Sequence, residues 1–338
     1  MPRQELPFDL NLLRVLLALD RARHVTRAAE LLNMSQSGFS SALARLRRRC
    51  GDELFVRSGG AMVETPAARR YIEAAEKAVA TVEQQILTPA VFDPARFHGD
   101  FRLVMADVAE IVFLPRLLAH LKRFAPGVSV RCQALPRETL SQALGDGSAD
   151  LALGYFPDLA SQAFYHQRLY LHTFACIVRR DHPLERGRMT PAIFSRLGHV
   201  VVESPSRSAG LLAAWLKKHR ITHHAVLHTP HHMSLAAIIE TSDLVATVPL
   251  AVAVWYARRG SVRVTPFPFK PPVFGVHQHW HRRYQHEPRH GWLRQQISHL
   301  FNETTDDWRQ VEEDLYGDTL REEYRRSVKS RVTPADSV

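Results

Sequence analysis

The chain has 338 residues, 45% of them hydrophobic and 23% charged, which is the composition of a globular protein with two or three domains. No run approaches the roughly 18 apolar residues of a membrane-spanning helix, and the N-terminus MPRQELPFDLNLL lacks an apolar signal core. Three widely spaced cysteines, Cys50, Cys132 and Cys176, do not suit a disulfide framework. These features argue against a membrane protein and a disulfide-rich secreted domain, and we expect a cytoplasmic chain without membrane contact.

Positive charge is concentrated near the N-terminus. The whole chain has 44 lysine and arginine residues against 34 acidic ones, a net charge of +10. Residues 1–70 hold twelve arginines, no lysine and seven acidic residues, which is half of that excess. An arginine side chain binds two acceptors at once on a phosphate or a guanine edge. The distribution therefore favours a nucleic acid as partner, with a solvated face of a helical domain as the alternative.

Three helices are predicted before residue 51. A broad leucine stripe predicts the first, from residue 9 to residue 21. The second is predicted to begin at Thr26 as its N-cap, and the third at Ser35 after a tight turn. The inward-facing residues of the third helix recur at helical spacing: Phe39, Ala42, Leu43 and Leu46. Small polar residues and arginines are left on its outer face.

This order of helices is that of a helix-turn-helix, whose second helix enters the major groove of DNA. The following segment, GDELFVRSGGAMVETP, predicts two short strands that form a wing, with Arg57 near its tip. We therefore expect residues 1–64 to form an all-α winged helix-turn-helix domain. The side chains expected to contact DNA are Thr26, Arg27, Ser35, Gln36, Ser37, Ser40, Arg45, Arg48 and Arg57.

A long helix is predicted over residues 65–89, because Thr65 is a good N-cap and Pro66 suits the first turn. Its apolar residues recur at spacings of three or four: Tyr71, Ala75, Ala78, Val82 and Ile86. Such a seam is typical of helix pairing, and a helix packed on its own domain is the alternative. We expect this linker helix to join two copies of the chain, in a homodimer or homotetramer.

From Phe101 onward the pattern alternates strand and helix. FRLVMAD, IVFLPRLLAHLKRFA, VSVRCQAL, RETLSQALGDG and ADLALGYF follow a βαβαβ order, and a second set begins near residue 171. Residues 90–303 are therefore predicted to form a two-lobed α/β domain, hinged like the periplasmic binding proteins. For the C-terminal extension, residues 304–338, we expect a frayed surface helix, with a partner contact as the alternative.

Ligands of such sheets bind in the cleft outside the carboxyl ends of the strands. One strand end, MADVAE, leads into a helix N-terminus, which attracts anions. Another, ESPSRSAG, combines hydroxyl groups with Arg207, which suits a carboxylate. The residues expected to bind a small molecule are Ala106, Asp107, Val108, Phe156, His172, Ser204, Ser206, Arg207, Ser208 and His232. Each one alone is equally well explained as a loop or core residue.

Catalysis and metal binding are not favoured. The chain contains no G-x-S-x-G elbow, phosphate-binding loop, G-x-G-x-x-G turn or H-E-x-x-H helix. His277, His279 and His281 would share one face of a strand, as zinc ligands do, but the next helix supplies no fourth ligand. We expect no catalytic residue, no cofactor and no metal.

The segment DLNLLRVLLALDRARHVTRAAELLNMSQSGFSSALARLRRRCGDELFVRSGGAMVETPAA resembles the winged helix-turn-helix of LysR-type transcriptional regulators, nearly end to end. MADVAEIVFLPRLLAHLKRFAPGVSV, SADLALGYFPDL, TSDLVATVP and HWHRRYQHEPRHGWLRQQISHLF resemble effector domains of the branch that answers aromatic acids and plant signals. The resemblance spans about residues 6–303.

The resemblance implies a regulator that binds an inverted-repeat operator in double-stranded DNA, contacts RNA polymerase and responds to an aromatic or other organic carboxylate. His172 matches a pocket histidine of the salicylate-responsive members, whereas Ala106 replaces their usual hydroxyl residue, which disfavours salicylate itself. Ser37 stands where a proline is frequent, so we expect a different base preference. A small-molecule-binding protein with a basic oligomerisation domain is the alternative function.

Overall fold

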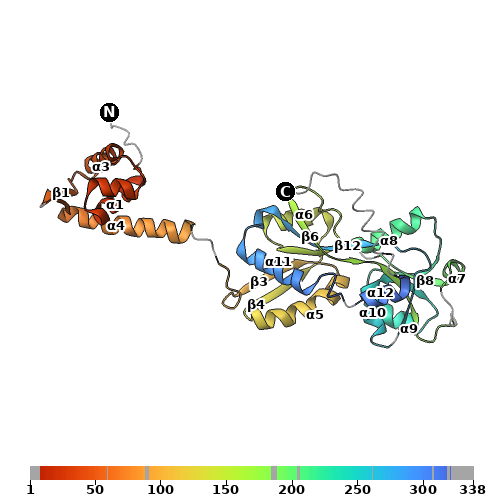
Figure 1. Ribbon diagram of the computed structural model, residues 1–338. Coiled ribbons are helices and arrows are strands. Elements are labelled where there is room, and N and C mark those ends of the chain that lie inside the picture. Colours follow the sequence, from red (N-terminus) through yellow and green to blue (C-terminus); the bar gives the residue numbers. More distant parts are fainter. Residues whose placement is uncertain are drawn as a thin grey trace. The chain divides into compact units, whose positions relative to one another are not determined.

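The computed structural model describes residues 8–58, 60–87, 91–183, 189–203, 206–260, 262–306, 308–317 and residue 320. The chain divides into two compact units, Met1–Val91 and Phe92–Val338, drawn in red to orange and in yellow to blue in Figure 1. Within the described ranges, no helix has the length and the apolar character needed to cross a membrane.

The N-terminal unit consists of three helices, a two-stranded wing and a longer helix. These elements are α1 (Asn11–Ala22), α2 (Val25–Leu31), α3 (Gln36–Cys50), β1 (Phe55–Ser58), β2 (Ala61–Glu64), α4 (Pro66–Val82) and the π-helical turn η1 (Glu83–Leu87). Two of the predicted N-caps are confirmed: Ser35 Oγ accepts the Gly38 N–H at 3.1 Å, and Thr65 Oγ1 accepts the Ala68 N–H at 3.1 Å. The prediction that Thr26 caps α2 is wrong, because α2 begins one residue earlier, after an extended His24.

One apolar core holds this unit together. The predicted inward face of α3 is buried, with Phe39 at 0% and Leu46 at 1% exposure. The first half of α4 packs on α1 through residues that include Ala75, so Ala75 is covered by its own domain rather than left for a partner. Farther along, Val82 at the end of α4 and Ile86 in η1 are 41% and 72% exposed. The end of α4 and the turn η1 therefore leave apolar side chains outside the core of this unit.

Lobe 1 of the second unit is a five-stranded sheet with three helices. Its strands are β3 (Gly99–Val104), β4 (Val128–Gln133), β5 (Leu151–Gly154), β6 (Phe164–His172) and β12 (Phe274–His281), and its helices are α5 (Asp107–Phe124), α6 (Arg137–Asp146) and α11 (Pro288–Leu300), which follows the 3-10 turn η2 (Arg282–Tyr284). The strand order is β4-β3-β5-β12-β6. Leu103 packs in the core with α5 while the adjacent Val104 packs with α6, so helices cover both faces of the sheet.

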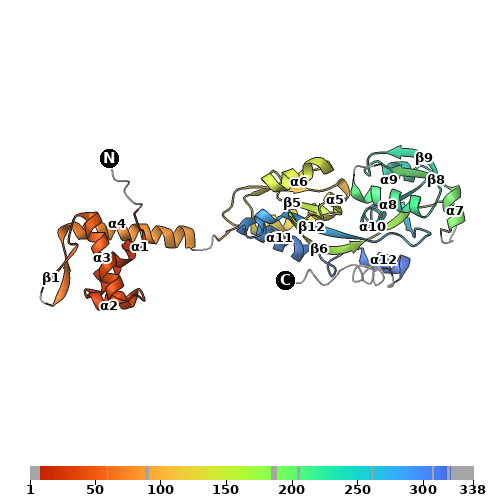
Figure 2. The ribbon, with the colours of Figure 1, turned by 90° about the horizontal axis from the view of Figure 1, so that it is seen from above.

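Lobe 2 has the strand order β11-β7-β10-β8-β9. Its strands are β7 (Phe174–Arg179), β8 (Gly198–Val202), β9 (His224–Thr229), β10 (Val245–Pro249) and β11 (Val262–Thr265), and its helices are α7 (Pro191–Arg196), α8 (Arg207–Lys218), α9 (Leu235–Glu240) and α10 (Leu250–Ala257). The chain enters this lobe between β6 and β7, at Thr173, and returns between β11 and β12. The two lobes lie side by side (Figure 2), and the predicted two-lobed α/β fold is confirmed.

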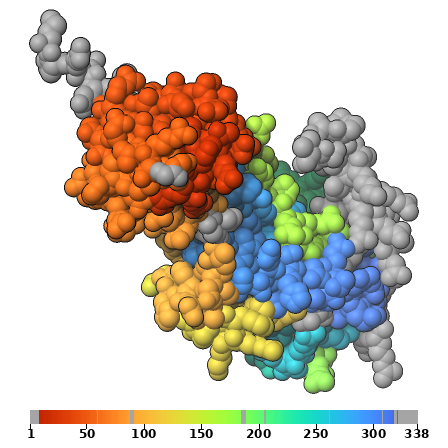
Figure 3. All heavy atoms as spheres, turned by 60° about the vertical axis from the view of Figure 1, so that its left-hand side comes forward, coloured from red at the N-terminus to blue at the C-terminus, as the bar shows by residue number. Residues whose placement is uncertain are grey.

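The start of the C-terminal extension forms α12 (Arg309–Tyr316), drawn in the darkest blue on the surface of the second unit in Figure 3. The expectation of a frayed helix is wrong for this segment: α12 packs on the unit's surface, and Trp308 at its start is only 8% exposed. Val311 and Leu315 follow it at helical spacing and pack on the same core. Residues 318, 319 and 321–338 lie outside the described residues.

Three histidine rings lie together on one face of the lobe 1 sheet. The ring centroids of His166, His277 and His279 are 5.3 to 5.7 Å apart, whereas His281 packs against Phe164. Across the described part of the chain, no three histidine, cysteine or acidic side chains are placed to hold a metal ion. Burial, reinforced by the neighbouring histidines, lowers the pKa of His277 to about 4 and that of His279 to about 3.

We predict that acid destabilises the second unit through these histidines. Because the folded pKa of His279 lies below its unfolded value near 6.5, its contribution is complete above pH 6.5 and declines as the pH falls toward the folded pKa. Between pH 7.5 and pH 5, His279 alone should cost about 2 kcal/mol of unfolding free energy. Urea unfolding at both pH values should show a smaller loss for His279→Leu than for the parent chain. Equal losses in the two proteins would contradict this role of His279.

Candidate functional sites

The outer face of α3 carries most of the side chains predicted to contact DNA. The exposed members of the predicted set are Arg27, Ser35, Gln36, Ser37, Ser40, Arg45, Arg48 and Arg57, whereas Thr26 is half-buried. Ser35 Oγ already accepts the Gly38 N–H and lies 3.2 Å from Ser37 Oγ, so it supports the start of the helix. The N-terminal half of this face is therefore small and polar, and its C-terminal half is basic.

One arginine of α3 is turned away from this face. Arg47 Nε donates to the Glu53 carbonyl at 2.7 Å, and its Nη2 donates to the Phe55 carbonyl at 2.8 Å. Its Nη1 also lies 3.3 Å from the Glu53 carboxylate. Arg47 thus ties the C-terminal end of α3 to the base of the wing, and its role is structural.

A cavity of about 610 Å³ lies between the two lobes of the second unit. Its lining includes the predicted residues Ala106, Asp107, Val108, Phe156, His172, Ser206, Arg207 and Ser208. Ser204 lies outside the described residues. His232 does not line this cavity: it lies behind Asp107 and lines a second cavity of about 490 Å³, whereas its neighbour His231 lines the first.

Arg207, at the start of α8, reaches across the cleft to lobe 1. Its Nη2 and Nε atoms donate to the Asp158 carboxylate at 2.9 and 3.2 Å, and its Nη1 donates to the Leu135 carbonyl at 3.2 Å. The guanidinium also lies 4.7 Å from the centroid of the Phe156 ring. Although burial raises the pKa of Asp158, Arg207 outweighs that effect and the pKa is lowered. The arginine predicted to hold a ligand carboxylate thus already holds a carboxylate of its own chain.

A second polar bridge crosses the cleft at the start of α5. His232 Nδ1 of lobe 2 lies 3.1 Å from the Asp107 carboxylate of lobe 1, and the Tyr256 hydroxyl donates to the His232 carbonyl. Burial raises the pKa of Asp107, but the hydrogen bond with His232 outweighs it and the pKa is lowered. Two hydrogen-bonded bridges therefore join the lobes across the cleft.

His172 lies where the chain passes from lobe 1 to lobe 2. It is 4% exposed, and its Nε2 accepts the Ala251 N–H at 3.2 Å, so in the neutral ring the proton is on Nδ1. The rings of Phe274, Tyr170 and Trp308 surround it, with centroids 5.6, 6.1 and 5.3 Å away. This rigid aromatic setting suits a planar ligand.

Several residues of the candidate site between the lobes were not predicted from the sequence. Asp158 stands two residues after Phe156 in the same strand-end loop, so the strand-end rule would have found it. Tyr170 precedes His172 by two residues and shares its face of β6. Phe274 of β12 pairs with His172 of β6, and only this strand register brings Phe274 to the cavity. Arg137 and Glu138, at the start of α6, also line the cavity.

Two family models match the chain. Residues 10–69 match "Bacterial regulatory helix-turn-helix protein, lysR family", and residues 94–302 match "LysR substrate binding domain". The HTH-type transcriptional activator NagR of a Ralstonia species is 34% identical over 87% of this chain and 98% of its own length. NahR of Pseudomonas putida, also an HTH-type transcriptional activator, is 33% identical over the same shares.

Solved structures show the same architecture. PA0477 from Pseudomonas aeruginosa superposes with a TM-score of 0.56 at 28% identity, covering 86% of this chain and 98% of that one. A full-length OxyR variant from Pseudomonas aeruginosa gives a TM-score of 0.58 over 86% of this chain and 99% of that one. At 17% identity, this second likeness concerns the fold alone.

Arg47 and the exposed Arg48 of α3 should differ in their contribution to the stability of the N-terminal unit. Arg47→Ala removes two hydrogen bonds to backbone carbonyls and should lower the unfolding free energy of the N-terminal unit by about 1–3 kcal/mol. Arg48→Ala, the matched control, removes an exposed side chain and should change it by less than about 0.5 kcal/mol. Thermal unfolding of both variants tests this, and an equal effect would place Arg47 on the outer face.

Proposed function

The chain belongs to the LysR family of DNA-binding transcriptional regulators, and we propose that an aromatic or other small organic carboxylate controls it from the cleft between the lobes. Its relatives are transcriptional regulators and not enzymes. The alternative of a basic oligomerisation domain without DNA binding is wrong, because residues 10–69 match a helix-turn-helix model. The cavity that Arg207 and His172 both line is the observation that carries the effector proposal.

The proposed DNA contact uses the outer face of α3. Gln36, Ser37 and Ser40 are small or flexible enough to contact base edges in the major groove. Arg45 and Arg48, one to three turns farther along, contact phosphates on the flanking backbone. Thr26 and Arg27 belong to α2, which precedes α3 in the chain, and they are proposed to contact the same DNA. Arg57 of the wing approaches the minor groove or the DNA backbone. Ser35 takes part chiefly as the cap that orients Gln36.

The proposed assembly is a homodimer or homotetramer joined through α4. Ala78 and Val82 of α4 and Ile86 of η1 are exposed, so these apolar side chains lie outside the core of their own unit. Pairing them would bury apolar surface and place two recognition helices on half-sites about one helical turn apart, in an inverted repeat. The same proposal includes action in the cytoplasm and a contact with RNA polymerase.

The proposed effector is held at the start of α8. Its carboxylate competes with Asp158 for the Arg207 guanidinium and accepts hydrogen bonds from the Ser206 and Ser208 hydroxyls. Ser206 Oγ also caps α8 by accepting the Ala209 N–H at 3.4 Å, so the helix N-terminus adds a favourable dipole. The ring of the effector packs among the aromatic side chains around His172. Binding changes the spacing of the lobes only as far as the effector prefers one arrangement over the other.

Base and phosphate contacts should respond differently to mutation. Gln36→Ala should cost about 1–3 kcal/mol on operator DNA and little on random DNA, because it loses a base contact. Arg48→Ala should weaken binding to both DNAs alike and reduce the slope of log affinity against log salt by about one. Both effects are measured by fluorescence anisotropy, with an operator selected from the DNA upstream of the gene that encodes this chain. Equal losses for Gln36→Ala on the two DNAs would refute the base contact.

The cleft variants should shift effector affinity in opposite directions. A thermal-shift screen of benzoates and aliphatic acids supplies the ligand, since binding to the folded state raises the melting temperature. Arg207→Ala should weaken a bound acid roughly ten- to hundred-fold, because it removes a charge-assisted contact. Asp158→Asn should strengthen it, because the competing carboxylate is gone while the guanidinium remains. Operator binding without effector should survive in both variants.

Calorimetric titration provides the comparison, with the corresponding neutral amide of the acid as a control ligand. The amide should respond much less than the acid to either substitution, since it carries no charge. If both variants bind the acid as the parent does, the effector site is elsewhere. If both substitutions weaken binding of the acid, the Arg207–Asp158 ion pair serves to close the cleft and Asp158 does not compete with the ligand.

A further inference from the structure

We infer that the segment after residue 302, described over residues 303–306 and 308–317, is a strap that fixes the hinge between the lobes and positions the aromatic wall of the cleft. The family model ends at residue 302, so this segment is additional to the domain that the family shares. The effect on ligand selectivity rests on the proposed function, whereas the effect on the hinge does not.

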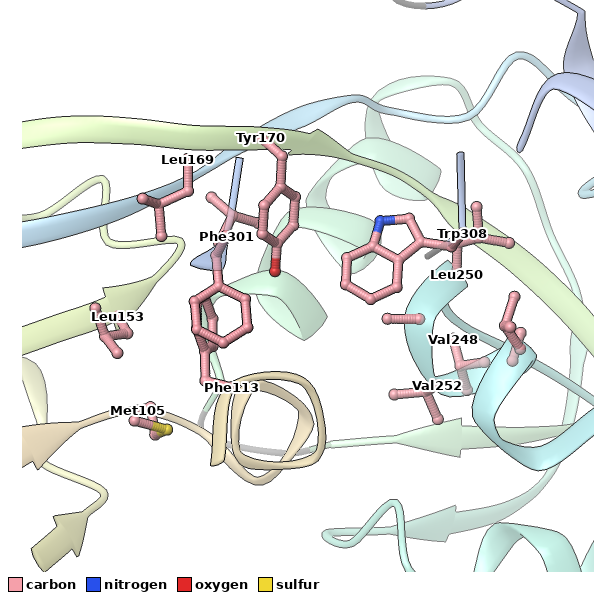
Figure 4. Packing of buried hydrophobic residues seen from close by; sticks show 14 of the residues in the cluster. Met105, Phe113, Leu153, Leu169, Tyr170, Val248, Leu250, Val252, Phe301 and Trp308 are labelled. Carbon is pink, nitrogen blue, oxygen red and sulfur yellow. The ribbon is translucent and has the colours of Figure 1, made fainter. Parts of the chain in front are cut away.

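Trp308 lies directly behind two side chains of the cavity wall. Its ring is 5.3 Å from Tyr170, at 62°, and 5.3 Å from His172, at 73°. Both of those residues line the cavity, so Trp308 is one layer removed from a bound ligand. Figure 4 shows its ring between Tyr170 of lobe 1 and the group of Val248, Leu250 and Val252 of lobe 2. Trp308 is therefore a positioning residue that packs on both lobes.

Tyr316 joins the two segments that pass between the lobes. Its hydroxyl donates to the Phe174 carbonyl at 2.7 Å and accepts the Phe267 N–H at 2.8 Å. Phe174 begins β7 just after the first crossing, and Phe267 lies on the return path between β11 and β12. Burial raises the pKa of Tyr316, so its hydroxyl stays neutral and remains a donor. A single side chain thus ties both crossings on the lobe 2 side.

The other end of the strap is attached to lobe 1. Arg116 of α5 donates to the Thr305 carbonyl at 2.8 Å, and Arg168 of β6 lies 3.3 Å from the Glu303 carboxylate. Between the two ends, Val311 and Leu315 pack on the shared core. A rotation of one lobe against the other must stretch or break contacts at one end. The strap therefore favours the interlobe arrangement seen here.

The first test measures the hinge in the unliganded full-length chain. Tyr316→Phe keeps the ring and removes only the hydroxyl bonds, and Gln310→Ala, on the exposed side of α12, is the matched control. Hydrogen exchange of the crossing segments, residues 172–176 and 264–275, should be roughly ten- to hundredfold faster in Tyr316→Phe, because two buried hydrogen bonds are lost. The control should match the parent. Parent-like exchange in Tyr316→Phe would overturn the strap.

The second test measures selectivity with benzoate and 2-hydroxybenzoate as probes. Trp308→Leu should change the ratio of their affinities about tenfold, and Trp308→Phe should restore most of it, because the wall behind His172 is rebuilt. A lower melting temperature with an unchanged ratio would make Trp308 merely structural and overturn its positioning role. If the parent chain binds neither probe nor any other acid, the proposed effector class fails, while the exchange measurement still decides the strap.

Discussion

The contact between Arg207 and Asp158 is the interaction on which the cleft depends. Both side chains are largely shielded from water, at 9% and 19% exposure. A charge in such a setting is costly when its partner is removed, so the guanidinium requires an anion at every stage. Lobe 1 provides an anion, Asp158, from the loop after β5. An effector with a carboxylate can take the same place, which links occupancy of the cleft to the bridge that joins the lobes.

The hinge limits how far the lobes can move when a ligand carboxylate replaces Asp158 at Arg207. Two chain segments and the C-terminal strap connect the lobes along the back of the cleft, and His172 lies at the first crossing with its Nε2 fixed by the Ala251 N–H. A ligand that displaces Asp158 at the front therefore acts against a rigid aromatic layer at the back. In the proposed mechanism, the resulting change is a shift between arrangements of the lobes, and its size is limited by the ligand's differential affinity.

Local rules predicted the parts of the chain that depend on neighbouring residues. Ser35 and Thr65 cap their helices as the sequence indicated, and the buried face of α3 follows from its periodicity. Strand ends brought eight predicted residues to one cavity, because the carboxyl ends of parallel strands meet at one edge. The remaining features depend on contacts between distant residues. The pairing of Asp158 with Arg207 joins residues 49 positions apart, and Phe274 reaches His172 only through the register of β12. Trp308 was misjudged because its burial depends on a surface that two lobes create together.

The most direct measurement is a crystal structure of the chain with the aromatic acid that stabilises it most. We expect the carboxylate of the acid to contact Arg207 and the serines at the start of α8, with Asp158 turned away and the ring against His172. An acid bound elsewhere, or one in the cleft while the Arg207–Asp158 ion pair remains intact, would contradict the account.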